Sequence, residues 1–218
     1  MDLLGRDTLE IVWLSLKVSG SAVILCAIIS LNLAFLIEQS DFPGKRLVLS
    51  LINTMMTIPA VAIGLLLYLV LMRRGPLGGS EILYTPYAMI LAQAILATPI
   101  ITGLSLVAIR RIDPSVRDTA FSLGATRFQW KLLALTEARF AISAAVITGF
   151  ARVVGETGMT MMVGGNIKGA TRVMTTAIAL ETMKGEFELA ISLGIILVIV
   201  ALGINLMLHL VQGAGKRR

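Results

Sequence analysis

The sequence predicts an all-α transmembrane protein with about five membrane-spanning helices. Of its 218 residues, 56% are hydrophobic and 15% are charged, a balance typical of a chain whose solvent is lipid. Apolar residues also gather in stretches of the roughly 20 residues that a helix needs to cross a hydrocarbon core. Because lipid offers backbone amides no hydrogen-bond partner, each crossing is expected to be helical. The expected spans, all within a single transmembrane domain over residues 1–218, are residues 11–37, 47–72, 84–109, 140–163 and 187–212.

A cysteine and two of the prolines in the first three expected spans bear on how these spans pack and bend. Cys26 lies inside the first span and is the one cysteine of the chain, so we expect it to pack rather than to form a disulfide or a thiolate metal site. Pro59 and Pro99 lie inside the second and third spans. Each removes a backbone hydrogen bond and is expected to kink its helix, either as a hinge or as a fixed architectural bend.

The fourth span carries two charges, Arg152 and Glu156, which are four residues apart. On one helix they share a face and can pair. A lone charge at mid-bilayer costs roughly 2.5–3.5 kcal/mol, so the pair is expected to face away from lipid. Two interpretations remain open: the pair lines a path through the membrane, or it holds helices together near a dimer axis.

Further residues are candidates for the lining of such a path. Methionines near the second and fourth spans are either a soft constriction or ordinary packing, and the threonines before the two prolines lie at the expected kinks. The glycines at 155, 158, 164 and 165 predict close helix approach, including approach between two chains. The complete set of path candidates is Met55, Thr57, Thr98, Arg152, Glu156, Met161 and Met162.

The polar segment from Asn166 to Glu186 precedes the fifth span. It is too polar to cross a membrane, but it carries an apolar face and is expected to be a helix on the outer surface. That helix either receives a soluble partner or lies in the membrane interface. The residues that form its apolar face are Val173, Met174, Ala177 and Ile178.

Charge distribution predicts the orientation. With the C-terminus inside, eleven lysines and arginines fall on the cytoplasmic side and seven on the outer side, which agrees with the enrichment of basic residues in cytoplasmic loops. The chain is therefore expected to be multi-pass, with its N-terminus outside. Its net charge of +6 is explained by these loops and predicts no nucleic-acid partner.

The loop over residues 110–139 is long, charged and patterned. Asp113 followed by Pro114 indicates a helix start, and Gly124 indicates its end. Thr126 and Gln129 form a capping box that opens a second helix. The first helix is amphipathic but too short to be stable alone, so it needs a surface to dock on: its own bundle, the bilayer or a cytoplasmic partner. Its expected apolar face is Ile112, Val116, Ala120 and Leu123.

Within this loop, the run Asp118-Thr-Ala-Phe-Ser-Leu-Gly-Ala125 resembles the "EAA" loop of permeases in ATP-binding-cassette (ABC) importers. Two positions depart from that pattern: Asp118 stands where glutamate is usual, and Thr119 replaces the first alanine. The resemblance implies a coupling helix that sits in a cleft of a separate ATPase subunit. The residues implied to couple to the ATPase are Asp113, Pro114, Val116, Arg117, Asp118, Ala120, Leu123, Gly124 and Ala125.

A second resemblance concerns the cargo. The run Gly155-Glu-Thr-Gly-Met-Thr-Met-Met-Val-Gly-Gly-Asn-Ile167 and the segment after it resemble type I, binding-protein-dependent permeases for molybdate, tungstate and sulfate, and most of all the tungstate-specific branch. This implies import of an oxyanion across a bacterial or archaeal cell (inner) membrane. Tungstate is the expected cargo, with molybdate or sulfate as alternatives. The implied partners are a second copy of the chain, two cytoplasmic ATPase subunits that hold the ATP and Mg, and an extracytoplasmic oxyanion-binding protein.

Enzymatic activity is not expected in this chain. It has no Gly-x4-Gly-Lys-[Ser/Thr] phosphate loop, and its single histidine and single cysteine supply neither a metal site nor a pair of haem ligands. No catalytic residue or bound cofactor is therefore predicted. The alternative function is an ATP-independent secondary transporter or channel for a small anion, although no internal repeat of the kind common in such transporters is evident. Co-purification of a soluble ATPase distinguishes the two.

Overall fold

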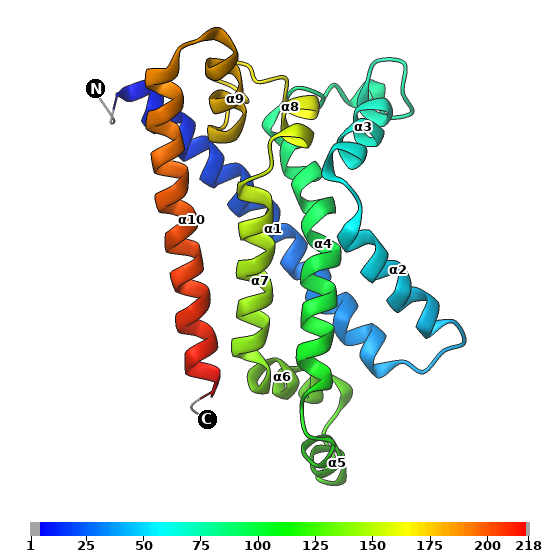
Figure 1. Ribbon diagram of the computed structural model, residues 1–218. Helices are drawn as coiled ribbons and strands as arrows, with labels where there is room; N and C mark the ends of the chain where they lie inside the picture. Colours follow the sequence, from blue (N-terminus) through cyan, green and yellow to red (C-terminus); the bar gives the residue numbers. More distant parts are fainter. Residues whose placement is uncertain (1–4, 217–218) are drawn as a thin grey trace.

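The computed structural model describes residues 5–216, and all regular structure among them is helical. This confirms the predicted all-α class. In chain order the helices (Figure 1) are α1 Arg6–Gln39, α2 Lys45–Thr57, α3 Ala60–Leu71, a 3-10 turn at Gly78–Ser80, α4 Pro86–Arg110, α5 Pro114–Ser122, α6 Arg127–Glu137, α7 Arg139–Val154, α8 Gly158–Gly164, α9 Met174–Lys184 and α10 Phe187–Lys216.

Three of these helices, α1, α4 and α10, are long and apolar enough to cross a membrane individually. Two bent pairs raise the possible number of crossings to five: α2 with α3, bent by 97°, and α6 with α7, bent by 73°. The predicted count of about five spans therefore holds only when each bent pair is taken as one crossing.

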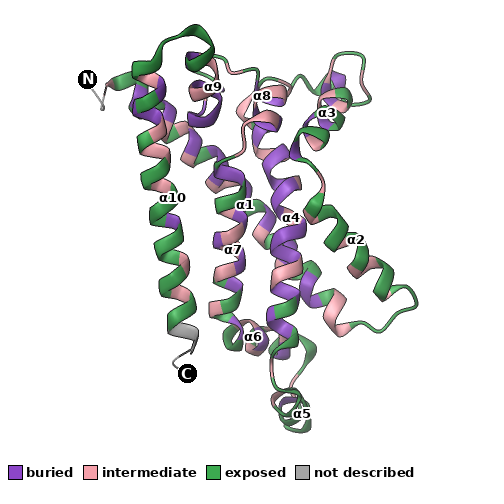
Figure 2. Cartoon of the chain, viewed as in Figure 1, coloured by how far each residue is buried: buried purple, intermediate pink, exposed green. Residues whose placement is uncertain are grey.

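Helix α4 forms the centre of the bundle. It packs against α1, α7, α2 and α8 and is the most continuously buried helix in Figure 2. Alanines at its contact with α1, such as Ala88 and Ala92, are fully buried and let the two backbones approach closely. Cys26 packs in the same cluster, as predicted. Helix α10, by contrast, has an exposed apolar surface suited to lipid.

The two intramembrane prolines behave differently. At Pro59 the second span is fully broken, because Ile58 before it is extended with ψ 131° and α3 starts anew at Ala60. This is the conformation that proline favours in the preceding residue. At Pro99, α4 continues unbroken from Pro86 to Arg110, so this proline does not interrupt its helix.

The expected single helix over residues 140–163 is wrong. Helix α7 ends at Val154, three non-helical residues follow, and α8 spans only Gly158–Gly164. Gly155 terminates α7, consistent with the low helix propensity of glycine. Glu156 therefore lies beyond the helix that carries Arg152.

The segment after α8 is also more buried than a surface helix. The predicted apolar face is confirmed in that Val173, Met174 and Ala177 are buried, but α9 packs against α10 and α1 instead of lying on the surface. The Met174 amide donates to Ser15 Oγ at 2.7 Å, which ties the start of α9 to α1.

The bundle has two distinct ends (Figure 1). One end, here the α5 end, gathers α5, α6, the turn between α1 and α2, and the last turns of α10. The other, here the α9 end, gathers α9, α8, the turn after α3 and the start of α1. The ends of α1 and α4 are joined at the α5 end by Arg110 Nε and Glu38 Oε2, 2.6 Å apart.

Candidate functional site

Helix α5 begins as the sequence predicts. Asp113 Oδ1 accepts a hydrogen bond from the Ser115 amide at 2.8 Å, and Pro114 occupies the first helical position. The Ser115 backbone amide holds the pKa of the Asp113 carboxyl below its usual value, because the bond favours the ionised form. The start of α5 is thus fixed by its own side chain.

Helix α5 ends in a two-bond glycine cap. Gly124 has φ +82°, its amide donates to the Phe121 carbonyl, and the Ala125 amide donates to the Ala120 carbonyl, both at 3.0 Å. This is the Schellman arrangement. The capping box then opens α6, with Thr126 and Gln129 bonding each other's backbone. The predicted pair of helices joined at a glycine is confirmed.

One face of α5 packs on the bundle. Ala120 is buried, and Ile112 and Val116 are partly buried against a cluster that includes Trp130. Leu123, however, does not share this face as predicted: it is 84% exposed. It follows the last helical residue, and the left-handed Gly124 turns the chain away from the helical path.

The opposite face of α5 is bare. Arg117, Asp118, Phe121 and Leu123 are exposed at the α5 end, and Phe128 on α6 adds another exposed apolar side chain. Large apolar side chains clustered on a surface indicate a binding site. The α5 tip, meaning this exposed set of five residues, is the first candidate site.

The second candidate site is the charge pair near the end of α7. Arg152 Nη1 lies 2.8 Å from Glu156 Oε2, so the predicted pairing is confirmed although the two residues are not on one helix. The Arg152 side chain is 41% exposed and that of Glu156 is 11% exposed. The Glu156 carbonyl also accepts hydrogen bonds from Thr160 Oγ1 and Thr175 Oγ1, both at 3.0 Å. Glu156 therefore joins α7, α8 and α9.

The remaining path candidates are dispersed. Met55 and Thr57 are both exposed, but at 100° per residue they lie on nearly opposite faces of α2. Thr98 is held between α4 and α1, where its carbonyl accepts from Ser30 Oγ at 3.2 Å. Met161 and Met162 are half-buried on α8.

Close helix approach is confirmed at Gly158 and Gly164, inside this chain. A Cβ added at Gly158 would lie 2.7 Å from Val61 Cγ2, and one at Gly164 would lie 2.8 Å from Met89 Sδ. Gly155 meets nothing within 4 Å. Sequence reasoning missed a contact of this kind against a backbone atom, in which a Cβ on Gly64 would lie 2.9 Å from the Met159 Cα.

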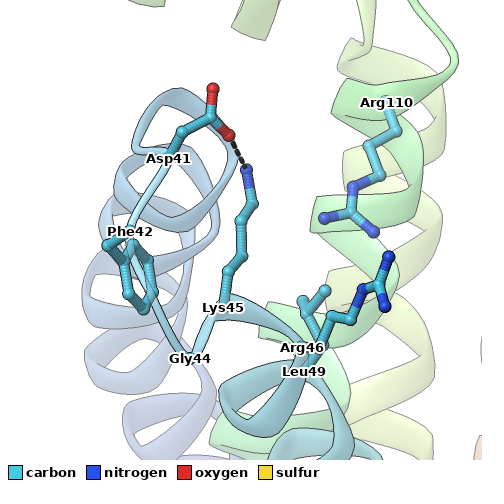
Figure 3. A pocket seen from close by; sticks show the side chains of 7 residues that line it. All are labelled: Asp41, Phe42, Gly44, Lys45, Arg46, Leu49 and Arg110. Carbon is cyan, nitrogen blue, oxygen red and sulfur yellow. Dashed lines mark hydrogen bonds and ion pairs between the residues drawn. The ribbon is translucent and has the colours of Figure 1, made fainter.

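A basic hollow at the α5 end was also missed (Figure 3). It measures about 490 Å³ and lies between the α1–α2 turn and the last turn of α4. Its three cations come from two places far apart in the sequence, so only the folded chain brings them together. The residues lining it are Asp41, Phe42, Gly44, Lys45, Arg46, Leu49 and Arg110.

Comparison with known proteins decides the family. Residues 27–218 match the model of the family described as "Binding-protein-dependent transport system inner membrane component". The chain belongs to this family. It is thus a multi-pass inner-membrane permease of a transport system, and the sequence-based assignment to ABC importer permeases is confirmed.

Two relatives of the permease share much of its sequence. The tungstate uptake system permease protein TupB of Peptoclostridium acidaminophilum is 38% identical over 202 residues, covering 93% of this chain and 89% of the relative. TupB of Campylobacter jejuni is 39% identical over 169 residues, covering 78% and 71%. Among solved structures, a chain of a bacterial alginate ABC transporter in complex with its pentasaccharide-bound periplasmic protein superimposes with a TM-score of 0.74. It is 18% identical and covers 98% of the permease and 81% of that chain.

Proposed function

We propose that this permease is the transmembrane subunit of an ATP-driven oxyanion importer, with tungstate as its cargo and molybdate or sulfate as the alternatives to be tested. The observation that carries the cargo assignment is the similarity to two tungstate uptake permeases from different organisms. Because the chain belongs to a family of binding-protein-dependent permeases, we place the ATP and Mg that power import on a separate subunit.

The α5 tip is the proposed contact for that ATPase. Leu123 and Phe121 are exposed. Phe121 lies on helix α5 and Leu123 directly follows it, and α5 lies at one end of the bundle (Figure 1). A protein partner is therefore the natural cover for them. The capped ends make α5 a short rigid body, and its inner face packs on the bundle through Val116 and Ala120. A movement imposed on α5 is then passed to α6 and, through the cluster that contains Trp130, to α1 and α4.

A second copy of the permease completes the proposed path. Arg152 is 41% exposed within a spanning segment, and lipid does not accommodate such a charge cheaply. Small side chains flank it on the same exposed or half-exposed face of α7, at Ala144, Thr148, Ala151 and Gly155. Small residues of this kind let two helices approach. We place the twofold axis and the aqueous path at this face, with two ATPase subunits bound to the dimer.

The α5 end is assigned to the cytoplasm, which places the N-terminus outside. Supporting this, the basic hollow and the charged α5–α6 segment lie at that end, as the excess of basic residues in cytoplasmic loops requires. An extracytoplasmic oxyanion-binding protein would dock on the α9 end. We also propose that residues 1–218 form one transmembrane domain.

Reconstitution tests the proposed function. The permease is co-expressed with an ABC-type ATPase subunit from the same organism, and the complex is placed in liposomes with an oxyanion-binding protein from that organism on one side. We expect ATP-dependent uptake that tungstate saturates at lower concentration than molybdate or sulfate. Uptake without ATP would instead establish a secondary transporter. Stimulation by none of the three oxyanions would overturn the cargo assignment.

A further inference from the structure

Helix α2 has three faces of different character. The first packs on α4: a Cβ on Gly103 would lie 3.2 Å from Met56 Sδ and 3.5 Å from Ile52 Cγ2. The second is apolar and exposed, with Leu47 at 74% and Leu51 at 57%. These two residues are separated by one helical turn, and so present a continuous surface to lipid.

The third face is polar and exposed. The α2 polar stripe consists of Arg46, Ser50, Asn53 and Thr57, whose spacings of four, three and four residues place them on one side of the helix. Thr57 Oγ1 donates to the Thr54 carbonyl at 2.8 Å. The side chains of Arg46, Ser50 and Asn53 have no hydrogen bond or ion pair with any described residue. Lipid cannot satisfy these groups, so the stripe faces water or protein.

The stripe leads into the basic hollow. Arg46 is both the first residue of the stripe and part of the lining of the hollow, where Figure 3 shows its guanidinium turned toward that of Arg110. Lys45 pairs with Asp41 at 3.4 Å, and Arg110 pairs with Glu38. The three cations and two carboxylates leave a net charge of +1 (3 − 2), which belongs to Arg46.

The α2 polar stripe and the basic hollow together have the charge and the hydrogen-bond donors that an anion in transit needs. Helix α2 contains no aspartate or glutamate, so nothing on the stripe repels a divalent oxyanion. Ser50 and Asn53 have free donors that replace water molecules around the anion, and a single neutral hydrogen bond is worth only about 0.5–1.5 kcal/mol net. The anion is thus solvated along the stripe without being trapped.

We propose that the α2 polar stripe forms one wall of the oxyanion path and that the basic hollow is the site from which the anion leaves at the α5 end. This inference rests on the proposed import function. It separates two residues that the sequence had grouped together: Thr57 lies on the path, whereas Met55 lies beside Leu51 on the lipid side.

Thiol accessibility tests this assignment. Because Cys26 is the one cysteine and is buried, a Cys26→Ala parent provides a clean background. Single cysteines are introduced at Ser50, Asn53 and Thr57, with Leu47 and Leu51 on the neighbouring face as matched controls. The complex in membrane vesicles is treated with an anionic, membrane-impermeant methanethiosulfonate. We expect labelling at the stripe positions, slowed by added tungstate, and none at the two leucine positions.

Equal labelling of both faces, or no labelling of the stripe in a parent that transports, would overturn the assignment. Disulfide formation between the cysteines introduced on the stripes of two copies would also overturn the assignment, because the stripe would then be a protein interface. A parent that transports none of the three oxyanions overturns the proposed function instead. As a second readout, Asn53→Asp should lower uptake by about tenfold or more, while Asn53→Gln should retain it.

Discussion

Arg152 Nη1 and Glu156 Oε2 are 2.8 Å apart even though α7 ends between the two residues. The glycine after Val154 turns the chain so that the carboxylate returns to the arginine and also accepts from the Met159 amide at 3.4 Å. The pair therefore closes the junction between α7 and α8, with Glu156 inside and Arg152 toward the proposed path.

The roles of the Arg152–Glu156 pair in stability and in uptake can be tested separately. Arg152→Met leaves a nearly buried carboxylate without its cation, which should lower the free energy of unfolding by about 1–3 kcal/mol and abolish most uptake. Adding Glu156→Gln should restore stability, because the uncompensated charge is gone, but not uptake. Thermal unfolding in detergent and uptake in proteoliposomes measure the two effects. Restored uptake in the double variant would make the pair purely structural.

Gly124 gives a test of coupling. A side chain at φ +82° costs roughly 1–2 kcal/mol for most L-residues, whereas asparagine tolerates this conformation. No atom lies within 4 Å of a Cβ added here, so the effect is one of backbone conformation and not of space. Gly124→Val should reduce oxyanion-stimulated ATP hydrolysis by about tenfold, while Gly124→Asn should retain it. Equal activity of the two variants would refute the role of this turn.

The contact between α3 and α8 gives a test of the fold. A Cβ at Gly64 would lie 2.9 Å from the Met159 Cα, a backbone atom that has no side-chain freedom to move away. We expect Gly64→Ala to lower the free energy of unfolding by about 1–3 kcal/mol. Gly20→Ala in α1 is the matched control, because it meets nothing within 4 Å and should be neutral or stabilising. Calorimetry or thermal unfolding in detergent compares the two, and equal stability would contradict this packing.

Local signals predicted local structure well. The caps of α5 and the box at Thr126 depend on a few neighbouring residues, so they are readable from the sequence and are confirmed. Hydropathy located the apolar stretches, but it does not distinguish a straight helix from a broken one. The sequence therefore did not show that the helix breaks after Val154. Nor did it show that Pro59 breaks its helix whereas Pro99 does not.

Long-range features were not predictable. The hollow combines Lys45 and Arg46 with Arg110 from another helix, and nothing in the spacing of these residues indicates that they meet. The burial of α9 depends in the same way on Ser15, which lies far earlier in the chain. Exposure of Leu123 was missed because the helical pattern was extended one residue beyond the last helical turn.

Photo-crosslinking from Leu123 tests whether the α5 tip contacts a separate ATPase. A photoreactive residue replaces Leu123 at the α5 tip or, as a control, the exposed Leu77 at the α9 end, in permease co-expressed with an ABC-type ATPase subunit from the same organism. We expect an adduct with the soluble ATPase from position 123 and none from position 77. An assembled, folded permease that yields no ATPase adduct from position 123, or that exposes this position to an impermeant label on the outer side, would contradict this contact.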